Sequence, residues 1–244
     1  MDYDCVLRPD LEALLMKPLE WNLKGADPSV LILHTHTTES YSKTEEDYAE
    51  SGSYRTLEEE YNMLSIGEAV EDILTEAGIG VIHDRQIHDH PSYNGSYVHA
   101  RNSTEKILKE NPGISLILDL HRDALDTQGK QMRTLAQVDG EATAQLMMVV
   151  GTDVSRQDHE NWQENLALAL KLHALLEREN PGIMRPVNLR GQRFNQDLSS
   201  GAMLIEMGAA GNTRGEALRA AQKLAEAIVF LSAGCRIDYN SWDT

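Results

Sequence analysis

The sequence predicts an α/β fold: a single domain with a mostly parallel, doubly wound sheet and helices on both faces. Short apolar runs typical of buried strands alternate with longer segments of helical periodicity. The 244 residues, 41% hydrophobic and 25% charged, suit one domain with a sizeable core. We assign this domain to residues 29–234, after a loosely held N-terminal extension of residues 1–28 and before a C-terminal tail of residues 235–244.

The first half of the domain is predicted to contain three strands and two helices. A capping box of Thr56 and Glu59 predicts the start of the first helix, and Gly78 its end. Polar residues 42–56 before it are expected to form a surface loop. In chain order, the predicted elements are a strand at residues 30–33, a helix at 56–78, a strand at 80–83, a helix at 98–110 and a strand at 114–120.

The second half is predicted to contain three strands and two helices. An Asp139-Gly140 turn is expected between the first two strands. Thr213 and Glu216 form a capping box at the start of the last helix. In chain order, these elements are strands at residues 131–138 and 144–150, a helix at 161–180, a strand at 202–205 and a helix from 212 to about 231.

The composition excludes several classes of partner and site. A formal net charge of -17 disfavours nucleic acid and anionic membranes, because both repel a polyanion. The chain contains neither the roughly 18-residue apolar run of a membrane span nor a signal-peptide pattern at its start. Cys5 and Cys235 are too far apart in sequence for a thiolate metal motif, and they are either a pair or two free thiols.

Three of the predicted strands end at residues that can do chemistry. His36, His121 and Glu206 follow the strands at residues 30–33, 114–120 and 202–205. Carboxyl ends of parallel strands meet at one edge of a sheet, where ligands bind. His36 and Glu39 have the HxxE spacing, which brings an imidazole and a carboxylate to one side of a tight turn. With His121 they make three protein ligands, the number in a catalytic zinc site.

Several assignments around these ligands stay open. Either His34 or His36 can be the ligand, since the two point to opposite sides if the strand continues through them. We favour His36, which leaves His34 to support the ligands or face a substrate. Asp119 and Asp123 flank His121, and either can accept its second N–H. Each histidine alone is also consistent with a polar residue bonded to the backbone.

Glu206 is the candidate general base. It leaves a buried strand and enters a loop of small residues, a costly position for an acid that only serves solubility. A carboxylate beside a zinc-bound water can take its proton and pass it to a leaving amine. The alternative is a carboxylate bonded to the backbone amides of that loop. Arg122 is a candidate either to support a ligand or to donate to the oxyanion.

Two polar loops are candidates for a substrate groove. One contains Arg193 and Asn195, and the other runs from Tyr93 to Arg101. No GxSxG, GxGxxG or P-loop motif occurs, so serine hydrolase and nucleotide-binding chemistry are not indicated.

Five motifs in this order make the chain resemble the stage II sporulation protein P family. They are HTHTTESY, HDHPSYNGSY, DLHRDA, RFNQDL and LIEMGAAGNT, and the resemblance extends from about Val30 to Leu231. It implies a fold and a zinc site similar to those of N-acetylmuramoyl-L-alanine amidases, with His36 and His121 as ligands and Glu206 as the catalytic acid-base. It also implies cleavage of the amide between muramic acid and L-alanine in peptidoglycan, and of cross-linked stem peptides.

The resemblance further implies a biological setting. This is thinning of septal cell wall during engulfment in a sporulating cell, together with a lytic transglycosylase, stage II sporulation protein D. The protein is then expected outside the cytoplasm, held by a membrane anchor that this chain does not contain.

The acidic ligand is where the chain departs from the broader amidase pattern. In those enzymes the glutamate ligand lies just before the first long helix, where this chain has Glu58, Glu59 and Glu60. Glu39 and these three acids therefore remain alternatives. The rival functions are a carboxypeptidase-like metallohydrolase and a wall-binding module without catalysis.

Overall fold

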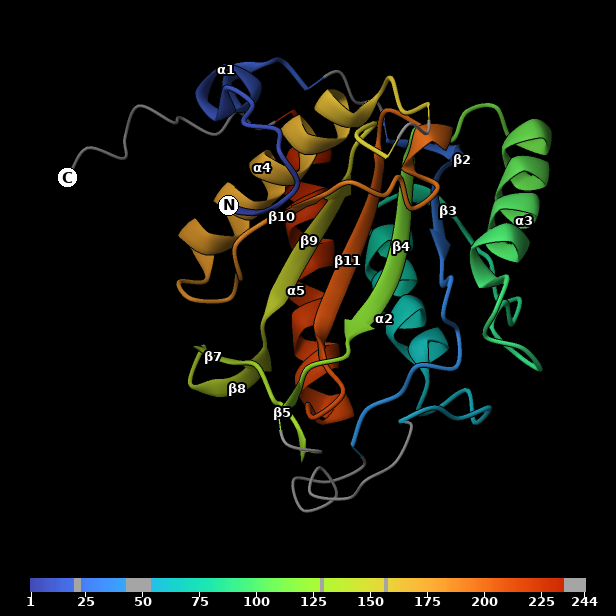
Figure 1. Cartoon of the computed structure of the whole chain (residues 1–244), viewed down its shortest axis with the longest axis vertical. Coiled ribbons are helices and arrows are strands. Elements are labelled where there is room, and N and C mark those ends of the chain that lie inside the picture. Colours follow the sequence, from blue (N-terminus) through green and yellow to red (C-terminus); the bar gives the residue numbers. More distant parts are fainter. Residues whose placement is uncertain (20–22, 43–53, 128–129, 156–157, 235–244) are drawn as a thin grey trace.

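A seven-stranded sheet with the strand order β1-β10-β9-β11-β4-β2-β3 runs through the centre of the molecule (Figure 1). Its strands are β1 (Asp2–Asp4), β2 (Gly25–Leu33), β3 (Ile79–His83), β4 (Leu116–Asp123), β9 (Leu146–Gly151), β10 (Asn188–Arg190) and β11 (Ala202–Ala209). This computed structural model describes the chain except for residues 20–22, 43–53, 128–129, 156–157 and 235–244.

The sheet is mostly parallel, as predicted. β11, β4, β2 and β3 run in one direction. β9, β10 and β1 are parallel to one another but antiparallel to β11. The carboxyl ends of β2, β4 and β11 therefore lie at the same edge, as the sequence predicts.

Helices cover both faces of the sheet unequally. α2 (Met63–Glu76), α4 (Trp162–Glu179) and α5 (Arg214–Ser232) pack on one face and form the main core with it. α3 (Ser96–Glu110) packs on the other face over β2 and β4. Figure 1 shows β9, β11 and the lower part of β4 without a covering helix on that second face, which we call the open face.

The alternation of side chains along β4 decides which residues reach the open face. Leu118 and Leu120 belong to the main core under α2 and α5, whereas Ile117 packs with Ala100 of α3. Successive strand residues point to opposite faces. Asp119, His121 and Asp123 therefore share the open face with Ile117.

The start of α2 differs from the prediction. Asn62 caps the helix by accepting from the backbone N–H of Leu64, and Thr56 makes a turn in which its hydroxyl accepts from the N–H of Glu58. The predicted capping box at Thr56 is therefore wrong, because this spacing also occurs in a turn. The capping box of Thr213 and Glu216 on α5 is confirmed.

The predicted loose extension at residues 1–28 contains a strand and a helix that pack on the rest of the fold, contrary to prediction. β1 adds to the sheet beside β10, and α1 (Leu11–Met16) packs on α4. The ammonium group of Lys171 in α4 donates to the carbonyl of Leu15 near the end of α1. The sequence signal is weak because the strand has only three residues and the helix six.

The Asp139-Gly140 turn is confirmed, but it joins β7 (Leu135–Val138) to β8 (Glu141–Ala144), a hairpin outside the main sheet. The strand predicted at residues 144–150 corresponds to β9, which pairs with β11 in the main sheet and not with the strand before the turn. A second small sheet pairs β5 (Asp126–Thr127) with β6 (Lys130–Gln131), and a 3-10 helix, η2, spans Gln196–Leu198.

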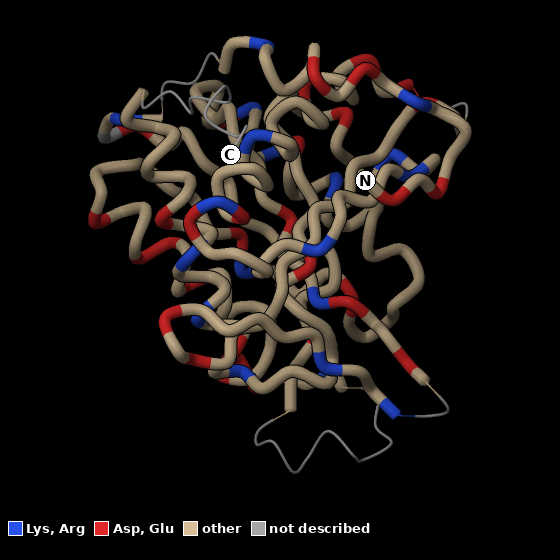
Figure 2. Tube along the Cα trace, turned by 90° about the vertical axis from the view of Figure 1, so that its left-hand side faces the viewer, with Lys and Arg blue, Asp and Glu red and all other residues tan. Residues whose placement is uncertain are grey.

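Charge is spread over the surface. In Figure 2, Asp and Glu occur on most of the helices and loops seen from that side, with Lys and Arg between them. None of the helices in the described residues has both the length and the apolarity to cross a membrane. Cys5 forms no disulfide within the described residues, and Cys235 lies outside them, as does most of the loop predicted at residues 42–56.

Gly67 of α2 lies where the helix approaches two imidazoles. A Cβ at this position would come within 2.6 Å of Nε2 of both His34 and His83. We expect Gly67→Ala to lower the free energy of unfolding by about 1–3 kcal/mol through overpacking. The exposed Gly215 of α5 is the matched control, since a Cβ there meets its nearest atom at 3.7 Å. Urea denaturation that finds Gly67→Ala as stable as Gly215→Ala would contradict this packing.

Candidate active site

His36 and Glu39 lie on a tight turn directly after β2. The N–H of Glu39 donates to the carbonyl of His36 at 3.0 Å, which closes the turn. Two buried carboxylates hold it: Asp119 accepts from the N–H and hydroxyl of Thr35, and Asp89 accepts from the same groups of Thr38. The predicted geometry of the HxxE segment is therefore present.

The turn lies beside His121. The rings of His36 and His121 meet edge to face with centroids 5.2 Å apart. Nδ1 of His121 lies 3.6 Å from Oε2 of Glu39. Two ligands of a tetrahedral zinc ion, each 2.0–2.1 Å from the metal, are about 3.4 Å apart. The distance between His121 and Glu39 is therefore close to that between two ligands of one ion, and the ring of His36 lies next to them.

Nε2 of His121 lies 2.9 Å from Oδ1 of Asp119, a contact of ion-pair length without hydrogen-bond geometry. Burial opposes a charge on His121, but Asp119 and Glu39 outweigh it and raise its pKa. Asp123, the predicted alternative partner, accepts from Arg185 instead. Asp119 is therefore the carboxylate that supports His121.

Glu39 is buried between positive groups. Its Oε2 accepts from the N–H of Arg122, and its Oε1 accepts from Arg55 at 3.3 Å. Burial alone would raise its pKa, but the contact with His121 and the charge of Arg122 lower the pKa of Glu39 to about 2. The carboxylate is therefore ionised at neutral pH.

Of the two roles predicted for Arg122, its contacts fit support of a ligand and not donation to a substrate. It is buried, and its guanidinium donates to the carbonyls of Ser40 and Tyr54. Its Nη1 also lies 3.7 Å from Glu39. Because β4 directs this side chain under the HxxE turn, Arg122 positions Glu39 instead.

Glu206 lies directly beside His121, because β11 and β4 pair in register at these residues. Its Oε2 is buried and has no hydrogen-bond partner among the described residues. On the other side Glu206 pairs with Met147 of β9. Burial raises the pKa of Glu206 to about 8. The alternative prediction, a carboxylate hydrogen-bonded to the backbone amides of the following loop, does not agree with this unpartnered Oε2.

The backbone after Glu206 turns sharply. Gly208 has φ of 79°, and the register of β11 against β4 shifts between Glu206 and Ala209. The side-chain oxygen of Asn212 then accepts from the N–H of Ala209 and of Thr134. This bulge ends the strand just beyond the candidate base.

Two observations fit a cation at this cluster. Nδ1 of His36 is buried without a hydrogen-bond partner in the described part of the chain. The carboxylates of Asp119 and Glu39 also raise the pKa of His121, which means that this cluster favours a positive charge. A metal ion bound to an imidazole takes the place of such a proton. No three acid, histidine or cysteine groups of the described residues form a ready metal geometry. The side chains are of the type that binds zinc, but their arrangement would have to change to close around an ion.

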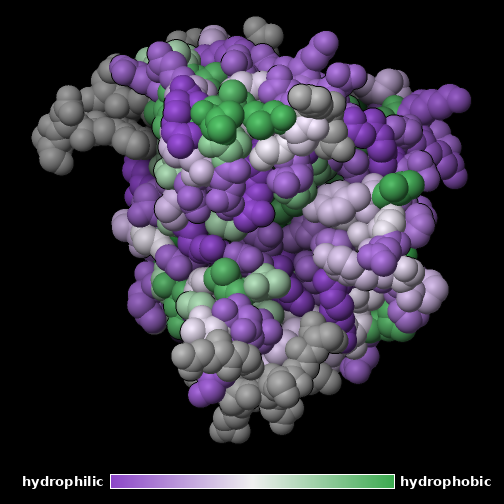
Figure 3. All heavy atoms as spheres, in the orientation of Figure 1, coloured by the Kyte–Doolittle hydropathy of each residue, from purple (hydrophilic) through white to green (hydrophobic). Residues whose placement is uncertain are grey.

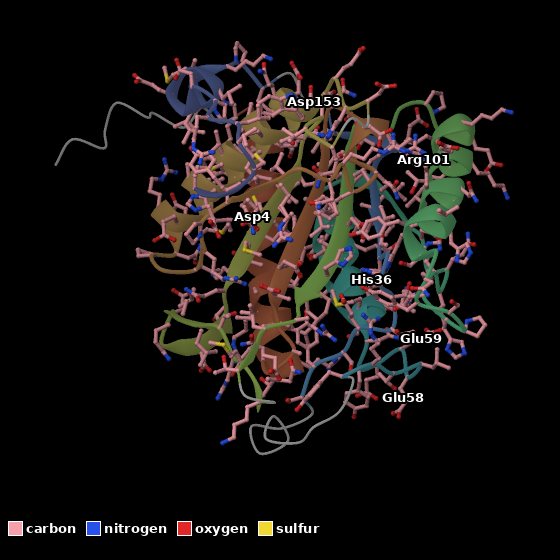
Figure 4. The ribbon with its side chains drawn as sticks, in the orientation of Figure 1. Asp4, His36, Glu58, Glu59, Arg101 and Asp153 are labelled. Carbon is pink, nitrogen blue, oxygen red and sulfur yellow. The ribbon has the colours of Figure 1, made fainter. Side chains whose placement is uncertain are left out.

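The alternative acidic ligands lie elsewhere. Glu58, Glu59 and Glu60 are exposed, and Glu59 is 3.9 Å from Arg85. Figure 4 shows Glu58 and Glu59 at the outer edge of the molecule, apart from His36. The structure therefore brings Glu39, and not these three acids, to the histidines.

His34 lies on the other face of the sheet. It is fully buried beneath α2, and its Nε2 lies 2.9 Å from Nε2 of His83, which contacts Glu71 in turn. Its Nδ1 donates to the carbonyl of Leu120. The predicted alternative of a substrate-facing His34 is wrong, because the strand directs it away from His36. Sequence reasoning did not identify His83.

The buried His34 predicts acid-sensitive stability. Burial, with His83 beside it, lowers the pKa of His34 to about 3. The unfolded chain takes up this proton below about pH 6.5, and the folded chain only near pH 3, so stability falls as the pH drops across that window. Between pH 7 and pH 5 the loss from His34 is about 2 kcal/mol. Urea denaturation with chelator present should show a smaller pH-dependent loss in His34→Gln, and an equal loss in both proteins would contradict the assignment.

The loop after β10 borders the open face. Its Phe194 packs on Met147, Val149 and Leu204. Asn195 donates to the carbonyl of Tyr97, and Arg193 lies 3.5 Å from Asp197. Figure 3 shows this face hollowed across its middle, with hydrophilic residues in the hollow. The ring of Phe194 also lies 5.9 Å from that of Tyr97, which lies 5.6 Å from that of His36, so this loop approaches the cluster. The role of Arg193 and Asn195 in a substrate groove stays a prediction.

Comparison with known proteins identifies relatives by sequence. The profile of the stage II sporulation protein P family matches residues 8–229. Stage II sporulation protein P of Bacillus subtilis (strain 168) is 30% identical over 218 residues, which are 83% of this chain and 50% of that protein. The chain thus spans about half the length of this relative.

Comparison of structures identifies two similar solved folds. An N-acetylmuramoyl-L-alanine amidase from Clostridium difficile 630 aligns with a TM-score of 0.50 and 16% identity, over 90% of this chain and 100% of that one. The CwlD amidase from Clostridioides difficile, solved in complex with the GerS lipoprotein, aligns with a TM-score of 0.46 and 14% identity, over 88% of this chain and 100% of that one. The first likeness supports the predicted α/β fold.

Proposed function

The chain belongs to the stage II sporulation protein P family, and on this premise we propose that it is a zinc-dependent peptidoglycan hydrolase that cleaves the amide between muramic acid and L-alanine. The observation that carries the proposal is the pairing of Glu206 with His121. A buried carboxylate without a partner among the described residues lies in register with one of two adjacent histidines. Few structural roles require that arrangement.

His36, Glu39 and His121 are the proposed metal ligands. When bound, zinc polarises the amide carbonyl and lowers the pKa of a water molecule. Arg122 and Arg55 hold Glu39 in its ionised form, and Asp119 orients His121 through Nε2. These neighbours fix the direction of each ligand.

Glu206 is the proposed proton carrier. Its carboxylate accepts the proton of the attacking water and then donates it to the nitrogen of L-alanine as the C–N bond breaks. In the absence of a cation, burial holds the pKa of Glu206 at about 8, and a nearby positive charge would lower it. An acid-base group works best with a pKa near the working pH.

The products of muropeptide digestion test this function. An amidase releases stem peptides with a new amino group on L-alanine, whereas a carboxypeptidase shortens the far end of the stem and an endopeptidase cuts the cross-links. We expect the first product, and its loss on treatment with a chelator. Turnover that releases only terminal D-alanine would establish that the protein is a carboxypeptidase-like metallohydrolase. Full binding to cell wall without any new amino group would establish the wall-binding module.

The biological setting remains part of the proposal. We infer action on septal cell wall during sporulation, outside the cytoplasm, with a sporulation lytic transglycosylase that cuts the glycan strands. The family membership supports the sporulation setting, and the amide and the glycan bond are chemically complementary targets in one polymer.

A further inference from the structure

Tyr93 is a large side chain with no place in the proposed chemistry, yet it covers His36. It is 55% exposed, although its ring is held against the imidazole. Its ring stacks on the imidazole with centroids 4.5 Å apart and planes inclined by 13°. The phenol oxygen lies 3.2 Å from Nε2 of His36.

Arg55 secures Tyr93 in this position. The guanidinium carbon of Arg55 lies 4.8 Å from the centre of the Tyr93 ring, within the range of a cation–π contact. The same guanidinium binds Asp89 at 2.5 Å and Glu39 at 3.3 Å. Because Asp89 also holds the HxxE turn through Thr38, Tyr93 belongs to the framework that sets this turn.

The two nitrogens of His36 have different surroundings. Nε2 contacts Tyr93, whereas Nδ1 is buried and makes no hydrogen bond within the described residues. A neutral imidazole carries one N–H. On Nδ1 that N–H would be buried without an acceptor, which costs about 1–3 kcal/mol. On Nε2 it is donated to the Tyr93 oxygen and leaves the Nδ1 lone pair free.

His121 has a carboxylate near each of its nitrogens. Its Nε2 faces Asp119, and its Nδ1 faces Glu39 across 3.6 Å. Because Glu39 is itself a proposed ligand, Asp119 is the supporting carboxylate of His121, although Nε2 of His121 makes no hydrogen bond among the described residues. The nitrogen left for a common ion is Nδ1.

We propose that Tyr93 is a positioning residue for His36: its hydroxyl accepts the Nε2 proton, fixes the tautomer and directs Nδ1 to the metal. This inference rests on the proposed zinc site and adds a residue to it. The hydroxyl acts through His36 and needs no contact with substrate. The stacked ring restricts rotation of the imidazole, and the hydrogen bond sets its protonation.

Tyr93→Phe separates the hydrogen bond from the stack. This variant keeps the aromatic ring and removes only the hydroxyl that accepts from His36. Because Tyr93 is exposed, the protein should still fold. Tyr97→Phe is the matched control, because the Tyr97 ring packs edge-on against His36 at 5.6 Å. We expect the zinc Kd, measured by competition with a chromophoric chelator, to rise about 10-fold or more in Tyr93→Phe, the usual effect of losing a ligand's supporting partner. In Tyr97→Phe it should change less than about two-fold.

Nitrogen-15 NMR of the imidazoles gives a readout that a purely structural role would not change. In the zinc-bound wild type we expect His36 to carry its proton on Nε2 and zinc on Nδ1. Zinc on Nε2, or a Tyr93→Phe protein with the wild-type Kd, would overturn the inference while leaving the zinc site intact. A wild-type protein that binds no zinc would instead overturn the proposed function on which the inference rests.

Discussion

Glu206→Gln is expected to lower kcat for muropeptide hydrolysis by about 10²–10⁴-fold, the usual contribution of a general acid-base group. Glutamine keeps the shape of the side chain but cannot accept the proton of water. Glu206 lies beside His121, yet it is not one of the proposed ligands, so the variant should bind zinc as the wild type does. Steady-state kinetics with parallel metal analysis measures both quantities.

The acid side of the pH profile adds a second readout. Because Glu206 must be ionised to accept a proton, kcat should rise with pH through the pKa of this group. The residual activity of the glutamine variant should lack that rise. Glu164→Gln is the matched control, since Glu164 pairs with Lys17 on the surface near α1 and should keep full activity. A Glu206→Gln enzyme with wild-type kcat and bound zinc would remove Glu206 from the chemistry.

Glu39→Gln is expected to weaken zinc binding by more than about 100-fold, beyond the 10–100-fold typical of a residue that only supports a ligand. The amide preserves the size of the side chain and takes away the charge that both Arg55 and His121 contact. Zinc per protein chain after dialysis and the Kd from chelator competition measure the effect.

Glu59→Gln is the control for this experiment, because Glu59 is the sequence alternative to Glu39 and is exposed near Arg85. It should retain the wild-type zinc content. The opposite pattern, with zinc lost from Glu59→Gln and kept by Glu39→Gln, would move the acidic ligand to the segment before α2.

The parts of the site that the sequence predicts follow from strand order. Apolar runs placed the strand ends well enough to bring His36, His121 and Glu206 to one edge, and the HxxE spacing added Glu39. The choice between His34 and His36 also follows from the alternation of a strand. The choice between the two histidines depends on which face of the sheet α2 covers, and the packing of the whole sheet determines that face.

The supporting residues were harder to predict because they come from elsewhere in the chain. Arg55 and Asp89 reach the HxxE turn from segments 16 and 51 residues away from their partners Glu39 and Thr38. Tyr93 belongs to a stretch that the sequence marks as polar loop, with no sign of which residue it would contact. A sequence pattern reports local periodicity, whereas these contacts depend on how two loops pack against each other.

The errors in secondary structure have the same origin. Thr56 and Glu59 have the spacing of a capping box, but the chain makes a turn there and α2 starts at Met63, capped by Asn62. β1 is too short to show a pattern, and it is a strand because β10 offers a free edge. In both cases tertiary contacts outweigh a weak local preference.

Diffraction recorded at the zinc absorption edge on crystals of the purified protein tests the central claim most directly. We expect one anomalous peak within coordination distance of His36, Glu39 and His121, with Glu206 beside its open position. An anomalous map without a peak among these three side chains, from crystals grown with zinc, would contradict it, as would a peak held by Glu58, Glu59 or Glu60.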